Sequence, residues 1–212
     1  MSINHFKKAS LAAGIAGTAT VTANARRDDA VNKLLAGIKD ADDKVRTEAW
    51  LSAGAVGAPA VMPLAETMGD DDLEVARAAK RALWKIVRYA GRPGAAKEKR
   101  AVETELVVLL GNNHPVSVRR EVIWMLSEIG GRNAIRPIAR LIENTELRED
   151  ARMALERVPT KRALQALKFR FKNAPEDFKP NIAQSLRKRG VEVDGYPCRK
   201  LVPKKKTNPK PL

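Results

Sequence analysis

The segment SVRREVIWMLSEIG at residues 117–130 has apolar residues at its positions 2, 6, 9, 10 and 13. They are Val118, Val122, Met125, Leu126 and Ile129. This spacing follows the 3.6-residue period of an α-helix, so these side chains lie on one face. The segment is therefore predicted to be an amphipathic helix with one buried stripe.

Four other segments align with this one without gaps: KVRTEAWLSAGAVG (44–57), EVARAAKRALWKIV (74–87), ELREDARMALERVP (146–159) and DFKPNIAQSLRKRG (177–190). Positions 2, 6 and 10 are apolar in all five segments, and position 13 is apolar in all but the last, where it is Arg189. Successive segments start about 30 residues apart, a spacing typical of helical repeats. One longer step contains GRPGAAKEKR (91–100), which we interpret as an inserted loop or helix extension.

A shorter amphipathic segment precedes each of the five, at residues 30–38, 60–68, 102–110, 134–142 and 163–171. Pro63 and Pro137 occupy equivalent positions in two of them, and proline is tolerated in a first helical turn. Asp and Asn residues in the short connections suit helix N-caps. Helix, short turn and helix about every 30 residues predict an all-α solenoid of about five stacked antiparallel pairs.

The chain resembles the HEAT-repeat proteins, in particular the short bacterial HEAT-like repeats also found in phycobilisome lyases. The resemblance rests on the A-[VI]-x-P-[LI] starts at 60–64 and 134–138, and on Val45-Arg46, Val118-Arg119 and Leu147-Arg148. It covers residues 28–190, with repeats at about 28–57, 58–90, 101–131, 133–159 and 162–190. It implies a right-handed array whose second helices line a concave surface and which holds partners.

Positions 4, 7, 8 and 11 of the aligned segments point away from the predicted core. We predict that this arc binds a protein partner through Trp50, Arg77, Lys80, Arg81, Trp84, Arg120, Trp124, Arg152 and Arg187. Aromatic and guanidinium groups suit an acidic or extended partner. The alternative is that each tryptophan packs against the next repeat and the basic residues only solvate the face. Arg46, Arg119 and Arg148 lie nearer the core, and we expect them to bond turn carbonyls or neighbouring acidic loops.

The chain has 40 Lys and Arg residues against 25 Asp and Glu, a formal net charge of +15. Segment 26–110 is nearly neutral, and most of the excess lies in 111–212. Such a charge favours anionic partners. It supports an alternative function, nucleic-acid binding through the basic second half and the tail.

The two ends of the sequence differ from the repeats. Residues 1–25 have a basic start, an uncharged run and Ala23-Asn24-Ala25, the order typical of a signal peptide. We therefore expect export to the periplasm or the medium, with a cytoplasmic protein carrying a leader as the alternative. Residues 191–212 form a basic, Pro/Lys-rich tail, which we expect to be extended, with Lys204, Lys205, Lys206 and Lys210 available for weak attraction to anions.

The sequence offers no recognised catalytic constellation. It lacks phosphate-binding, dinucleotide-binding, zinc-protease and nucleophile-elbow motifs. With two histidines far apart and one cysteine, we predict no metal site, no cofactor and no disulfide framework. Glu128 and Glu156 near Trp124 only loosely match HEAT-like DNA glycosylases, and the likeness to bilin lyases extends only to the repeat. We therefore expect a non-catalytic binding or scaffold protein, with such an enzyme as a minor alternative.

Overall fold

The computed structural model describes residues 24–197, and their regular structure is entirely helical. Residues 24–38 are helical and are followed by α2 (Asp43–Ser52), α3 (Val61–Thr67), α4 (Leu73–Ala90), α5 (Ala96–Val108), α6 (Val116–Ile129), α7 (Arg132–Arg140), α8 (Arg148–Arg157), α9 (Lys161–Asn173) and α10 (Lys179–Lys188). Three short 3-10 helices, η1 (Ala53–Ala55), η2 (Ala58–Ala60) and η3 (Leu141–Glu143), extend or precede them. The predicted all-α fold is therefore confirmed.

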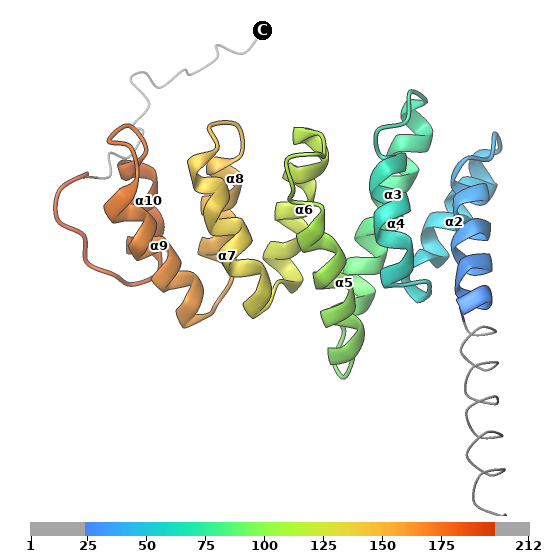
Figure 1. Cartoon of the computed structure of the whole chain (residues 1–212), viewed down its shortest axis with the longest axis horizontal. Coiled ribbons are helices and arrows are strands. Elements are labelled where there is room, and N and C mark those ends of the chain that lie inside the picture. Colours follow the sequence, from blue (N-terminus) through green and yellow to red (C-terminus); the bar gives the residue numbers. More distant parts are fainter. Residues whose placement is uncertain (1–23, 198–212) are drawn as a thin grey trace, which may run out of the picture.

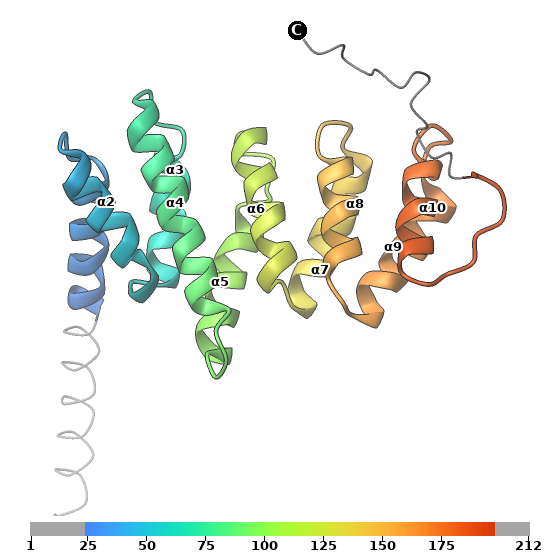
Figure 2. The same ribbon diagram turned by 180° about the vertical axis from the view of Figure 1, so that it is seen from behind.

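The helices form a row of five pairs that stand side by side in chain order (Figures 1 and 2). Each second helix packs on the next one, from α2 to α4, α6, α8 and α10. The first helices do the same, from α3 to α5, α7 and α9. The pairs are thus related by successive steps along a stack, as expected of a solenoid.

One continuous hydrophobic core runs through the stack, from Val31 in the first pair to Leu186 in the last. The apolar positions of segment 117–130 all lie in it. Within the first pair the two helices approach closely, since a Cβ on Gly37 would lie only 2.7 Å from the Cβ of Ala49. No pair has a core of its own, so each is stabilised by its neighbours.

The polar turns supply helix caps, as predicted. The Asp42 carboxylate accepts a hydrogen bond from the Lys44 backbone N–H at 2.8 Å at the start of α2. Asp72 does the same for Glu74 at 2.8 Å at the start of α4. These caps satisfy backbone donors that have no partner in the first turn of a helix.

The prediction for Pro137 is wrong, because this proline lies inside α7 and not in its first turn. The helix begins at Arg132, two residues before the predicted segment, because Glu103 of α5 caps it from a distance. The Glu103 carboxylate accepts the Gly131 and Ala134 backbone N–H groups at 2.8 and 3.1 Å.

Several predictions concern residues outside the described range. The export signal falls almost wholly there, as do Lys204, Lys205, Lys206 and Lys210, and these stay predictions. Within 24–197, no helix is long and apolar enough to cross a membrane.

Candidate functional site

The second helices α2, α4, α6, α8 and α10 form one face of the stack, here called the second-helix face, and every residue of the predicted arc lies on these helices. Trp50, Trp84 and Trp124 are all half-buried there. The three tryptophans nevertheless have different surroundings, which divide the face into two kinds of surface.

Two tryptophans are fixed by an acidic residue of the next repeat. The Trp84 Nε1–H donates to Glu121 Oε2 at 3.3 Å, and Lys80 of the same helix forms an ion pair with Glu121. We call this arrangement a carboxylate clamp, because one carboxylate holds an indole and a cation of the preceding repeat.

The clamp recurs one repeat further along. The Trp124 Nε1–H donates to Asp150 Oδ1 at 3.0 Å, and Arg120 Nε donates to Asp150 Oδ2 at 3.0 Å. Arg120 also donates to the Glu146 carbonyl at 3.0 Å. The two clamps therefore hold neighbouring repeats together through Trp84, Trp124, Lys80 and Arg120. For these residues the structure agrees with the alternative in which the tryptophans pack against the next repeat.

Arg152 of α8 lies among acidic groups. It is only 9% exposed and donates two hydrogen bonds of 2.9 Å to Glu149 and one of 3.0 Å to Glu156. Burial raises the pKa of each carboxyl, but the hydrogen bonds and nearby cations outweigh it, so the pKa of both Glu149 and Glu156 lies below the usual range. Arg152 thus has its charge compensated within the chain.

Arg187 of α10 is also occupied. Its guanidinium donates to the carbonyls of Val193, Gly195 and Tyr196 at 2.6–3.0 Å. The Tyr196 ring meets the Phe171 ring edge to face, with centroids 5.6 Å apart. Residues 191–197, counted with the tail in the sequence, are therefore held against the fifth pair.

The arginines expected to be structural are confirmed in that role. Arg46 donates to the Ala41 carbonyl at 2.9 Å, and the buried Arg119 donates to the Leu110 carbonyl at 3.1 Å. Arg148 reaches the acidic loop of the next repeat, where it donates to Asp177 at 2.9 Å.

Trp50 differs from the other two tryptophans. The residue of α4 that corresponds to Glu121 and Asp150 is Ala78, which cannot accept a hydrogen bond through its side chain. The Trp50 Nε1 atom is buried and has no hydrogen-bond partner within the described part of the chain. Its ring instead has two cations nearby, the Arg81 guanidinium and the Lys85 ammonium, each 5.9 Å from its centroid.

A hollow of about 440 Å³ lies at this point, between α2 and α4, and we call it the α2–α4 hollow. Its lining consists of two tryptophans and five basic residues: Trp50, Arg77, Lys80, Arg81, Trp84, Lys85 and Arg88. The Arg88 guanidinium lies 5.4 Å from the Trp84 ring centroid. Arg77 and Lys80 pair with Glu74 and Glu121, whereas Arg81, Lys85 and Arg88 have no ion pair among residues 24–197.

The structure brings five predicted residues together in this hollow: Trp50, Arg77, Lys80, Arg81 and Trp84. The sequence analysis missed Lys85 and Arg88, because one lies beside the predicted arc and the other beyond the aligned segment. The sequence does indicate Arg88, because it follows Trp84 by four residues and Arg81 by seven. This spacing places the three side chains on one helix face.

The two acidic residues considered for catalysis are both paired. Glu128 lies 3.8 Å from the Arg157 guanidinium, and Glu156 lies 2.6 Å from the Lys188 ammonium. No cluster of three or more metal-binding side chains occurs in the range that the structure describes. Both carboxylates are therefore held in ion pairs within the chain.

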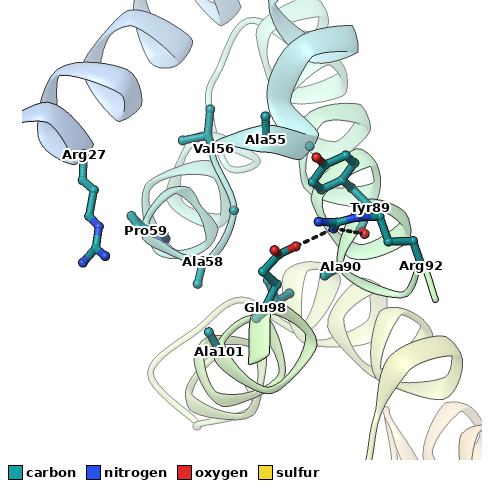
Figure 3. A pocket seen from close by; sticks show the side chains of 13 residues that line it. Arg27, Ala55, Val56, Ala58, Pro59, Tyr89, Ala90, Arg92, Glu98 and Ala101 are labelled. Atoms are coloured by element: carbon teal, nitrogen blue, oxygen red, sulfur yellow. Dashed lines mark hydrogen bonds and ion pairs between the residues drawn. The ribbon is translucent and has the colours of Figure 1, made fainter. Parts of the chain in front are cut away.

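A second hollow, of about 520 Å³, lies where the end of α4 meets α5 and the turn between α2 and α3 (Figure 3). Its walls include Val56, Ala58 and Pro59, and Glu98 and Arg92 form an ion pair in it. The Arg92 guanidinium also lies 3.8 Å from the centroid of the Tyr89 ring. Two basic residues, Arg27 and Arg92, line this hollow, and Arg92 is paired with Glu98, so it suits an anion less well than the α2–α4 hollow with its five basic residues does.

No protein-family model matches the chain, and no curated protein matches it in sequence. Among solved structures, it is similar to the designed armadillo repeat protein YIII(Dq)4CqI, at 18% identity over 73% of this chain and 80% of that one, with a TM-score of 0.39. It is similar to the designed armadillo repeat protein YIII(Dq.V1)4CPAF in complex with peptide (KR)4, at 21% identity over 73% and 80%, with a TM-score of 0.41. An engineered protein is similar at 21% identity over 74% and 78%, with a TM-score of 0.39.

The stacked helix pairs themselves give the chain the architecture of an ARM/HEAT-like α-repeat protein.

Proposed function

We propose that this protein is a non-catalytic scaffold of the HEAT-like kind, which holds an extended segment of a protein partner on its second-helix face. The α2–α4 hollow is the anchor for the anionic part of that segment. The observation that carries the proposal is the gathering of five basic residues and two tryptophans in one hollow, with three of the cations lacking an ion pair in residues 24–197.

The arrangement of charge supports a protein partner over a nucleic acid. Net charge is highest in the second half of the chain, but there Arg120, Arg148 and Arg152 are engaged by carboxylates of the same chain. The three cations of the α2–α4 hollow that lack an ion pair within residues 24–197, Arg81, Lys85 and Arg88, lie in the nearly neutral first half. A duplex needs many phosphate contacts along its length, whereas this basic surface is confined to one repeat.

The test uses a fluorescein-labelled acidic peptide and fluorescence anisotropy. We expect binding to weaken at least about tenfold in the double variant Arg81→Glu/Lys85→Glu, because both cations face Trp50 in the hollow. The matched control is Arg136→Glu/Arg140→Glu, which reverses two exposed basic residues with the same spacing on the first helix α7. If both variants lose the same peptide affinity, the loss follows from net charge alone and the proposal is wrong.

A random-sequence DNA duplex is the second probe. We expect its affinity to be lower than that of the acidic peptide at physiological salt. If the duplex binds more tightly, with a steep salt dependence, the chain is a nucleic-acid-binding protein.

A further inference from the structure

We infer that the α2–α4 hollow recognises a single phosphorylated side chain in the partner segment, and not a run of Asp and Glu residues. This inference rests on the proposed function and adds the chemistry of the anchored group.

The first argument is the concentration of charge. Arg81 and Lys85 are one helical turn apart on α4, and both lie 5.9 Å from the centroid of the same Trp50 ring. Arg88 follows on the same helix face, 5.4 Å from the Trp84 ring centroid. One carboxylate would leave most of this charge uncompensated. A phosphoryl group carries about −1.5 to −2 charges and three acceptor oxygens, which suits several cationic donors at once.

The second argument is the short extent of the basic surface. On the side towards α6, Glu121 forms the first clamp and Asp150 the next. Glu149 and Glu156 continue the acidic groups on α8. These carboxylates are paired with the cations around them, Lys80, Arg120 and Arg152, so a continuous polyanion would find little uncompensated positive charge on α6 and α8. The face therefore favours one compact anion with uncharged or basic flanks.

The third argument is size. A volume of about 440 Å³ exceeds what a phosphoryl group fills, and it falls within the usual range of ligand sites. The remaining space is bordered by the indole rings of Trp50 and Trp84, which suit the carbon atoms of the side chain that carries the phosphate. Cations and aromatic rings together thus match a phosphate ester better than a free anion.

The experiment compares labelled peptides that share one extended, otherwise uncharged sequence and differ only at the centre. The central residue is serine, phosphoserine, phosphotyrosine, one glutamate or three glutamates. We expect at least one phosphopeptide to bind about tenfold more tightly than the three-glutamate peptide in anisotropy titrations. The serine peptide should bind weakest.

Two variants test the location of the site. We expect the phosphopeptide advantage to disappear in Arg81→Gln/Lys85→Gln and to fall in Arg88→Gln, since these residues supply the unpaired cations. It should persist in Arg136→Gln/Arg140→Gln. Urea unfolding of each variant shows whether it is folded, and Arg88 is exposed and has no ion pair in the described structure, so its replacement removes a cation without leaving a buried partner unpaired.

The outcomes separate the inference from the proposed function. If the three-glutamate peptide binds as tightly as the phosphopeptides, with the same dependence on Arg81 and Lys85, the scaffold proposal stands and the phosphate inference is wrong. If inorganic phosphate at equal concentration displaces the phosphopeptide completely, the site takes a free anion, and the inference is also wrong. If no peptide binds, or if a DNA duplex binds more tightly than all of them, both fail.

Discussion

The carboxylate clamp shows how one residue can decide whether a tryptophan N–H has a hydrogen-bond partner in the next repeat. Glu121 and Asp150 each accept an indole N–H and hold a cation of the preceding repeat. Where Ala78 takes the equivalent place, the Trp50 N–H has no partner among the described residues, and the nearby cations remain uncompensated. The α2–α4 hollow therefore lies where the clamp between one second helix and the next is missing.

The clamp at Asp150 gives a direct prediction for stability. Asp150→Ala leaves the half-buried Trp124 N–H without its acceptor and removes the Arg120 ion pair, so we expect the free energy of unfolding to fall by about 1–3 kcal/mol. Urea denaturation followed by circular dichroism measures this. Asp71→Ala, which removes an exposed carboxylate with no hydrogen bond in the described structure, should change the free energy of unfolding by less than about 0.5 kcal/mol. A similar loss in both variants would contradict the clamp.

The lowered pKa of Glu156 predicts a loss of stability in acid. Burial raises this pKa, but hydrogen bonds from Lys188 and Ser185 and the charges of Lys188 and Arg152 lower it below 4.5 overall. A group with a lowered folded-state pKa stabilises the protein above its unfolded value, and this contribution disappears as pH falls through the folded value.

We therefore expect Glu156→Gln to be less stable than the wild type near neutral pH, and the difference to shrink as pH falls from about 6 to about 3. Urea midpoints at several pH values provide the measurement. Glu48→Gln makes the same chemical change on the exposed part of α2 and should track the wild type. A constant difference between Glu156→Gln and wild type would show that the carboxylate charge is not involved.

At the scale of helices, the break in the repeat pattern at Arg189 has a structural reason. Its guanidinium donates to the carbonyls of Leu155, Glu156, Val158 and Thr160 at 2.8–3.1 Å. The last carbonyls of a helix lack partners within it, and a cation there also complements the helix dipole. One arginine thus caps α8 from the neighbouring repeat, where the other aligned segments have an apolar residue.

Replacing this cap should loosen the connection between α8 and α9. We expect Arg189→Ala to lower the free energy of unfolding by about 2 kcal/mol, because up to four carbonyls lose a donor. Arg189→Lys should recover only part of this, since an ammonium lacks the planar fork of donors. Thermal and urea unfolding measure both, with Arg162→Ala on the exposed start of α9 as control. If Arg189→Ala is as stable as the wild type, water satisfies these carbonyls as well as the guanidinium does.

The sequence predicts helices well where local periodicity determines them, and poorly where distant groups intervene. The five aligned segments all fall on second helices, because the apolar stripe that defines each helix depends only on residues within that segment. The start of α7 was misplaced because its cap, Glu103, lies 28 residues before Gly131 in sequence. The clamps escaped prediction for the same reason, since Lys80 and Glu121 are 41 residues apart. Such pairs depend on how one repeat is rotated against the next.

At the scale of the whole molecule, net charge and available charge differ. The net charge of +15 lies mainly in the second half of the sequence. There, basic side chains of α8 and α10 are hydrogen-bonded to carboxylates and carbonyls of the same chain. The half that is nearly neutral by count holds the hollow lined by five basic residues. Segment charge therefore predicts an anionic partner, whereas only the arrangement of acidic neighbours shows where unpaired cations gather on the second helices.

The distribution of buried side chains predicts which end of the stack opens first. The helix α2 has no buried residue, whereas α6 has eight, and α10 is covered by residues 191–197. Among residues 24–197 the first pair packs on one neighbouring pair only, and such a pair opens at lower free energy in a linear stack.

We therefore expect backbone amides of α2 to exchange with deuterium at least about tenfold faster than those of α6, measured by mass spectrometry of peptic fragments. A bound phosphopeptide should slow exchange in α2 and α4, because it bridges Trp50 to the cations of α4, and should leave α8 and α10 unchanged. In Arg81→Gln/Lys85→Gln the peptide should give no protection, although the free protein should exchange as before. Protection spread evenly over all the second helices would mean that the partner lies along the entire face, with no anchor at the α2–α4 hollow.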